Sequence, residues 1–196
     1  NHKNPIVIPI ERTAKLLGKE WIQINTQMEE ELVYQGGKLT GDIHIHSGQK
    51  EQKIDNIYLK IYVHPSKDSS EKIEVTTYQI VKSFTIQPNE SHTFPIECVL
   101  PYDTPLSSQE TKLWIHTLVE IDKVLYTCDQ SELNVNPHPN VQKILDSLKV
   151  VGFTLESTNC TYDLDRQQFK QKLTYIPTNP HSEQAKMELS YQQSTV

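Results

Sequence analysis

Basic residues are scarce in this chain, and no segment is rich in them. Its 19 lysines and arginines are outnumbered by 25 aspartates and glutamates, which gives a formal net charge of −6. The chain therefore lacks the basic stripe that nucleic acids and anionic membranes attract. It also lacks any apolar run near the roughly 20 residues that span a bilayer. We expect no nucleic-acid partner and no membrane insertion.

Cysteine is equally sparse. Cys98, Cys128 and Cys160 are the three in the chain, and an odd number leaves one thiol over in any disulfide pairing. Free thiols fit a reducing compartment, so we expect a cytoplasmic protein with three unpaired cysteines.

Catalytic signatures are also missing from the sequence. There is no Gly-x-Ser-x-Gly motif, and Asp103, between two prolines, is placed to cap a turn. We expect no catalytic residue, no cofactor and no enzyme.

Strand patterns dominate what is present. Phe94, Ile96, Cys98 and Leu100 alternate with polar residues, which is the two-residue period of a half-buried strand. The same period recurs in the segments 22–25, 43–46, 57–63, 73–86 and 113–121. Clusters of Gly, Pro, Asn and Ser separate these segments, as in an antiparallel β-sandwich. We predict one sandwich domain over residues 19–136, after a tail of unknown role over residues 1–18.

One helix is predicted directly after this sandwich. Pro137 and Pro139 stiffen a linker, and then an apolar stripe at helical spacing begins. The stripe consists of Val141, Ile144, Leu145 and Leu148, and Gly152 stands where a helix would stop. Few strand patterns follow, so we expect a second domain over residues 137–196 that is incomplete or completes its sheet with a partner.

Several segments together resemble the bacterial sporulation-control protein family, which has the arrestin-like fold. The resemblance is carried by Gly36–Gly41, by GQKEQKIDNIYL at 48–59, by Phe84–Glu90, by Leu-Pro-Tyr-Asp-Thr-Pro at 100–105, by Lys-Leu-Trp-Ile-His-Thr at 112–117, and by Pro137-His138-Pro139. It implies an all-β protein of two tandem arrestin-like β-sandwich domains, with one short helix at the start of the second. It also implies a cytoplasmic regulatory role without chemistry.

Three aromatic residues are candidates for contact with a protein partner. Trp114 alternates with Ile115, so it is predicted on the less apolar face of its strand, and an exposed Trp can anchor a partner. Tyr58 and Tyr62 form a second pair on an outer face. Two other interpretations stay open for Trp114: packing under the neighbouring domain, or a strand buried on both faces. Cross-strand packing is the alternative for the tyrosines.

Two histidines on one strand are candidates for a metal site. His44 and His46 alternate on one strand, so they share a face, but a site needs further ligands from another segment. His64, His92 and His116 are available, and no spacing selects one of them. We therefore expect a solvated sheet face and no metal.

The leading hypothesis is a non-enzymatic regulatory adaptor that binds proteins through the surfaces and edges of its sheets. The same edges would also allow a homo-oligomer. The alternative is a carbohydrate- or small-ligand-binding sandwich that uses Trp114, Tyr58 and Tyr62 as stacking platforms.

Overall fold

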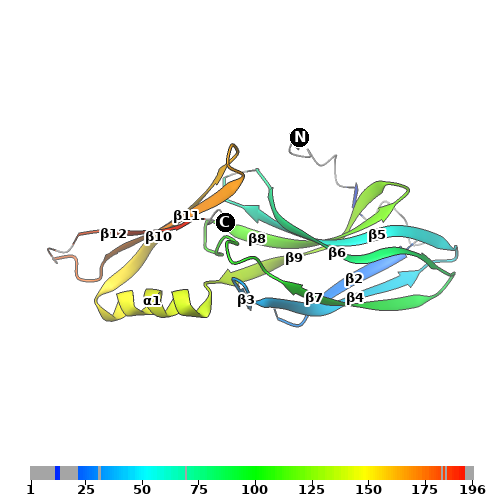
Figure 1. The fold of residues 1–196 in the computed structure, drawn as a ribbon, viewed down its shortest axis with the longest axis horizontal. Helices are drawn as coiled ribbons and strands as arrows, with labels where there is room; N and C mark the ends of the chain where they lie inside the picture. Colours follow the sequence, from blue (N-terminus) through cyan, green and yellow to red (C-terminus); the bar gives the residue numbers. More distant parts are fainter. Residues whose placement is uncertain are drawn as a thin grey trace.

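A computed structural model describes residues 12–13, 22–30, 32–68, 70–181, 183 and 185–192. Most of the predicted tail 1–18 lies outside these residues. Figure 1 shows a layered β structure that continues into one helix and a smaller sheet. The elements are β1 (Arg12–Thr13), β2 (Ile22–Met28), β3 (Leu32–Tyr34), β4 (Lys38–Ser47), β5 (Gln52–His64), β6 (Ile73–Ile86), β7 (Ser91–Val99), β8 (Lys112–Ile121), β9 (Val124–Asn136), α1 (Pro139–Val150), β10 (Phe153–Asp163), β11 (Gln168–Pro177) and β12 (Met187–Gln192).

Strands β1 to β9 form two sheets that face each other (Figure 1). One has the order β1-β9-β8-β5-β6, with β3 also paired to β9, and the other has the order β2-β4-β7. Apart from the parallel pairs of β1 and β3 with β9, the pairs are antiparallel. Pro95 lies in β7, which is an edge strand. Proline lacks a backbone N–H, and at an edge position this removes no hydrogen bond between strands. We call these nine strands the sandwich.

The core of the sandwich lies between the two sheets and is built by the alternation seen in the sequence. Leu39 and Ile43 of β4 are fully buried, and they meet Leu59 and Ile61 of β5 in one apolar cluster. Ile96 of β7 is 2% exposed in the same cluster. The predicted inward faces of these strands are confirmed.

The single helix among the described residues begins and ends as predicted. Pro139 occupies its first turn, and the His138 side chain accepts a hydrogen bond from the Asn140 N–H at 3.2 Å. Leu145 is the buried member of the apolar stripe. After the helix, Gly152 adopts a φ of 88°, a left-handed conformation that glycine takes without strain.

The chain after α1 forms a small antiparallel sheet of order β10-β11-β12. We call α1 with this sheet the C-terminal unit. The observed fold is all-β with one short helix, as expected from the resemblance. The domain division at residue 136 stays a prediction, because a continuous apolar cluster includes Leu133, Val135, Leu145 and Phe153 from both sides of it.

Candidate functional site

A cavity of about 790 Å³ lies where the sandwich meets the C-terminal unit. It is lined by the segment Leu106–Glu110, by Val135–Pro137 at the end of β9, by Gln142, Leu145 and Lys149 of α1, by Phe153–Thr158 of β10, and by Leu173, Tyr175 and Thr178. We call it the edge groove. A cavity of this volume is in the range that binds small ligands or anchoring side chains.

The edge groove lies along a strand edge rather than on a sheet face. It touches every residue of β10 from Phe153 to Thr158, although alternate residues of a strand point to opposite faces. Among the described residues, strand β10 pairs with β11 alone. The Thr178 N–H donates to the Gly152 carbonyl at 2.8 Å, and the β10–β11 register that starts from this bond shifts at a β-bulge between Leu155 and Ser157. The groove therefore runs beside the edge of β10 that does not face β11.

The floor of the edge groove is apolar. Leu145, Phe153, Leu173 and Tyr175 are each at most 8% exposed there, whereas Leu155 at the strand edge is 42% exposed. Burial raises the pKa of the Tyr175 hydroxyl, and the nearby Asp146 carboxylate raises it further, so this tyrosine stays neutral. The groove thus combines an apolar floor with an exposed leucine beside it.

The opposite wall of the groove is formed by Leu106–Glu110, which belong to the segment 100–111 that we call the junction loop. The Gln171 side chain, 3% exposed, binds Leu106 reciprocally: it accepts from the Leu106 N–H at 2.7 Å and donates to the Leu106 carbonyl at 2.9 Å. On the sandwich side, the Ser107 N–H donates to the Val135 carbonyl at 3.0 Å. The junction loop is therefore hydrogen-bonded to both parts of the molecule.

A second set of contacts fixes the linker before α1. The Gln35 side chain donates to the Thr104 carbonyl at 2.7 Å and accepts from the His138 N–H at 3.3 Å. Tyr102 of the junction loop lies over Gly36, where a Cβ atom would come within 2.3 Å of the tyrosine ring. This close approach explains the glycine in the Gly36–Gly41 motif.

The predicted contact residues lie elsewhere, on the outer face of the β5–β8 pair. Trp114 pairs in register with Tyr62 and with Glu132, and it is half-buried. Tyr58 is also half-buried, and its hydroxyl donates to the Glu120 carboxylate at 3.4 Å. Tyr62 is 1% exposed, so it offers almost no surface to a partner. The partner role of Trp114 and Tyr58 stays a prediction.

The burial of Tyr62 has a local cause. Its ring meets the ring of His116 at 4.9 Å, and the Lys72 ammonium lies 3.9 Å from its centroid. His116 and Leu118 are themselves at most 4% exposed, although alternation predicts them on the outer face. The middle of β8 is thus buried on both faces, which was one of the interpretations left open from sequence.

The remaining candidates behave as polar surface or as core. His44 and His46 lie on the outer face of the β2–β4–β7 sheet, hydrogen-bonded to Thr93 and Ser91. Among the described residues, no three His, Cys, Asp or Glu side chains converge as for a metal ion.

No helix in the described part of the chain is long and apolar enough to cross a membrane.

All three cysteines are unpaired in the structure. Burial raises the pKa of each thiol, to about 12 for Cys128 and to about 11 for Cys160. Such thiols carry little thiolate near neutral pH and are poor nucleophiles.

Comparison with known proteins identifies the family. The model of the Spo0M family, described as SpoOM protein, matches residues 10–194. The chain belongs to the Spo0M family. The sporulation-control protein Spo0M of Bacillus subtilis is 28% identical over 175 residues, which cover 85% of this chain and 68% of that protein. Its crystal structure matches with a TM-score of 0.72 at 19% identity, over 88% of this chain and 91% of that one. The resemblance inferred from sequence is confirmed, and membership supports a regulatory role in sporulation.

Sequence reasoning missed the edge groove and the Gln171–Leu106 pair. Gln171 lies 65 residues from Leu106, and no motif marks a glutamine that binds a distant backbone. The one available signal was polarity, because Gln171 stands at an inward position of its strand between Phe169 and Leu173.

Proposed function

We propose that this Spo0M-family protein is a non-enzymatic regulatory adaptor of the cytoplasm that binds an extended segment of a protein partner in the edge groove. The observation that carries the proposal is the free edge of β10 facing a groove with an apolar floor. Strand addition supplies backbone hydrogen bonds for affinity, and side-chain pockets supply specificity.

The chemistry of the groove supports a protein ligand. An extended segment along Leu155 would pair its backbone with β10 and place an apolar side chain over Leu145 and Phe153. The rim carries Glu110, Lys149 and Glu156, and Glu156 forms an ion pair with Lys186 at 2.5 Å. Charges of both signs at a rim around an apolar centre are the usual arrangement of a protein interface.

The test places a photo-crosslinking amino acid at Leu155 and, as a matched control, at Leu164. Both leucines lie in the C-terminal unit and are exposed, but Leu164 is in the turn between β10 and β11, outside the groove. We expect a defined protein to be crosslinked in sporulating host cells from position 155 and not from position 164. Equal crosslinking from both positions would contradict the proposal.

Affinity for the purified partner gives the second readout. Leu155→Lys places a charge at the strand edge and should weaken binding by about 2 kcal/mol, a roughly thirtyfold loss. Leu164→Lys adds the same charge and should leave affinity unchanged.

Trp114 provides an independent contact to test. If it anchors a partner, Trp114→Ala should weaken capture by about 2 kcal/mol while the circular dichroism spectrum is unchanged. If the Trp114 side chain instead packs within the protein, the variant should be less stable. Its partner binding should then fall in proportion to the fraction of molecules that remain folded.

The alternative function is carbohydrate binding through the same outer-face aromatics. The burial of Tyr62 removes one of the three stacking platforms and leaves Trp114 and Tyr58. A glycan array decides between the two functions: signal that depends on Trp114 would favour the sugar ligand, and its absence would favour the adaptor.

A further inference from the structure

We propose that His44 and His46 form a surface binding site for a divalent transition metal ion of the Cu²⁺, Ni²⁺ or Zn²⁺ type. The two residues are separated by one position on β4, so their side chains project from the same face of the β2–β4–β7 sheet. They line a second, open cavity of about 490 Å³ together with residues of the three strands: Gln23, Ile24, Asn25, Ile45, Ser91, His92 and Thr93. The site is remote from the edge groove and shares no residue with it.

Both imidazoles are oriented in the same way by the adjacent strand. His44 Nδ1 lies 3.0 Å from the Thr93 hydroxyl, and His46 Nδ1 lies 2.8 Å from the Ser91 hydroxyl. These are direct cross-strand partners, so the β4–β7 register places a hydroxyl opposite each ring. In the tautomer whose Nδ1–H donates to the hydroxyl oxygen, each Nε2 carries a free lone pair. Outer hydrogen bonds of this kind hold ligating histidines in metal sites.

The neighbouring strand supplies oxygen-bearing side chains beside the two imidazoles. Strand β2 places Gln23 opposite His46 and Asn25 opposite His44, so two carboxamide side chains are within reach of the same face. His92 also lines the cavity, but its ring stacks with Phe94 at 6.0 Å and its Nε2 lies 3.2 Å from the Glu90 carboxylate, so it is not counted among the ligands. Two imidazoles with water and amide oxygens suit Cu²⁺ best. The affinity of such a nitrogen and oxygen site increases along the first-row divalent metals and is highest for Cu²⁺.

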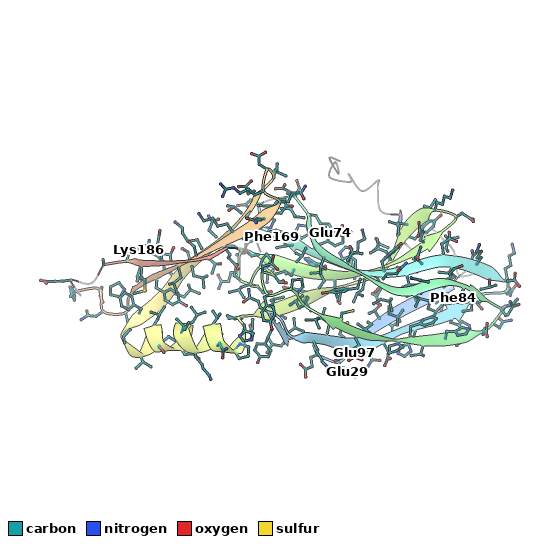
Figure 2. The ribbon with its side chains drawn as sticks, in the orientation of Figure 1. Glu29, Glu74, Phe84, Glu97, Phe169 and Lys186 are labelled. Carbon is teal, nitrogen blue, oxygen red and sulfur yellow. The ribbon has the colours of Figure 1, made fainter. Side chains whose placement is uncertain are left out.

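The charge of the sheet face favours a cation. Strands β2, β4 and β7 contain one basic residue, Lys38, which pairs with Glu97 at 3.5 Å. Asp42 stands two positions before His44 on the same face, and Glu29 follows β2. Figure 2 shows Glu29 and Glu97 on the side of the β2–β4–β7 sheet turned away from β5 and β8. The common orientation of the two rings supports a metal site at a place where the sequence alone predicts none.

The test is a calorimetric titration of the untagged full chain with Cu²⁺, combined with electron paramagnetic resonance of the bound ion. We expect one site with hyperfine coupling to two nitrogens. His44→Gln/His46→Gln should lower the affinity at least tenfold and remove this coupling. The matched control His64→Gln/His181→Gln removes two histidines outside this sheet and should bind as the wild type does. Unchanged binding by the first variant, or lost binding by the control, would overturn the proposal.

A third variant tests the orienting hydroxyls. Ser91→Ala/Thr93→Val keeps both imidazoles and removes their partners, so the affinity should fall by about tenfold with two-nitrogen coupling retained. An affinity equal to that of the wild type would show that the rings are not oriented by β7, and would overturn this part of the argument. His46→Gln alone, at an exposed position, repeats the ligand test if either double variant fails to fold.

Discussion

The sandwich and the C-terminal unit reach their structures in different ways. In the sandwich, two sheets bury one another, and Leu39, Ile43 and Leu59 have no exposed surface. In the C-terminal unit a single sheet packs against one helix, and Ile144, Leu155 and Leu164 are at least 42% exposed. The sandwich is therefore stabilised by its own core. The C-terminal unit depends on the junction loop, and this dependence leaves a strand edge open for binding.

The largest expected difference between the two regions comes from the same substitution made in each. Ile96→Ala opens a cavity in the sandwich core and should lower the free energy of unfolding by about 2–5 kcal/mol. Ile144→Ala removes a side chain on α1 that is 60% exposed. This variant should change the free energy of unfolding by no more than about 0.5 kcal/mol. Denaturant unfolding measures both. Similar losses of unfolding free energy for the two variants would show that the C-terminal unit is as well packed as the sandwich.

The second prediction addresses the junction. Gln171→Met keeps the length of the side chain but leaves the Leu106 N–H and carbonyl without their partner, at a cost of about 1–3 kcal/mol. Hydrogen exchange should report faster opening of β10 and β11 with unchanged protection of β5 and β8. Gln168→Met, on the same strand, is the control. It should leave the exchange rates of β10 and β11, and those of β5 and β8, unchanged. Faster exchange throughout the sandwich would show that the two regions unfold together.

Most of the sandwich could be predicted from sequence because its strands repeat one local rule. Alternation placed Ile96, Ile57 and Leu113 correctly on inward faces, and helical spacing with Pro139 and Gly152 located α1. Alternation alone gives no information about what covers the other face. Tyr62 and Leu118 were therefore expected at the surface and are buried.

The candidate sites were less predictable because each joins distant segments. The edge groove combines residues 106–110 with β10, and the histidine site depends on the β4–β7 register, which pairs residues 45 and 49 positions apart. Neither the loop position nor the register follows from local patterns. The sequence did show that His44 and His46 share a face, but not that both rings are oriented alike.

The third prediction compares thiols in the two regions. Burial raises the pKa of Cys128 in the sandwich to about 12 and that of Cys160 in the C-terminal unit to about 11, so both thiols are protonated near neutral pH. Labelling of a buried thiol requires local opening, and the C-terminal unit lacks a closed core, so labelling of the native protein at pH 8 should modify Cys160 faster than Cys128. Mass spectrometry identifies the labelled site. In denaturant, all three cysteines should react alike. Faster labelling of Cys128 would show that the sandwich opens more readily than the C-terminal unit.

The smallest effect is expected at the end of α1, where the C-terminal unit begins. Gly152 has a φ of 88°, and a Cβ atom built there meets nothing within 4 Å. Gly152→Ala should therefore cost only backbone strain, about 1 kcal/mol, because no steric clash adds to it. Gly152→Asn should cost less, since asparagine tolerates the left-handed region. Hydrogen exchange at the last turn of α1 measures both variants. An alanine variant as protected as the wild type would show that the helix end can shift, and that the junction loop alone positions the unit.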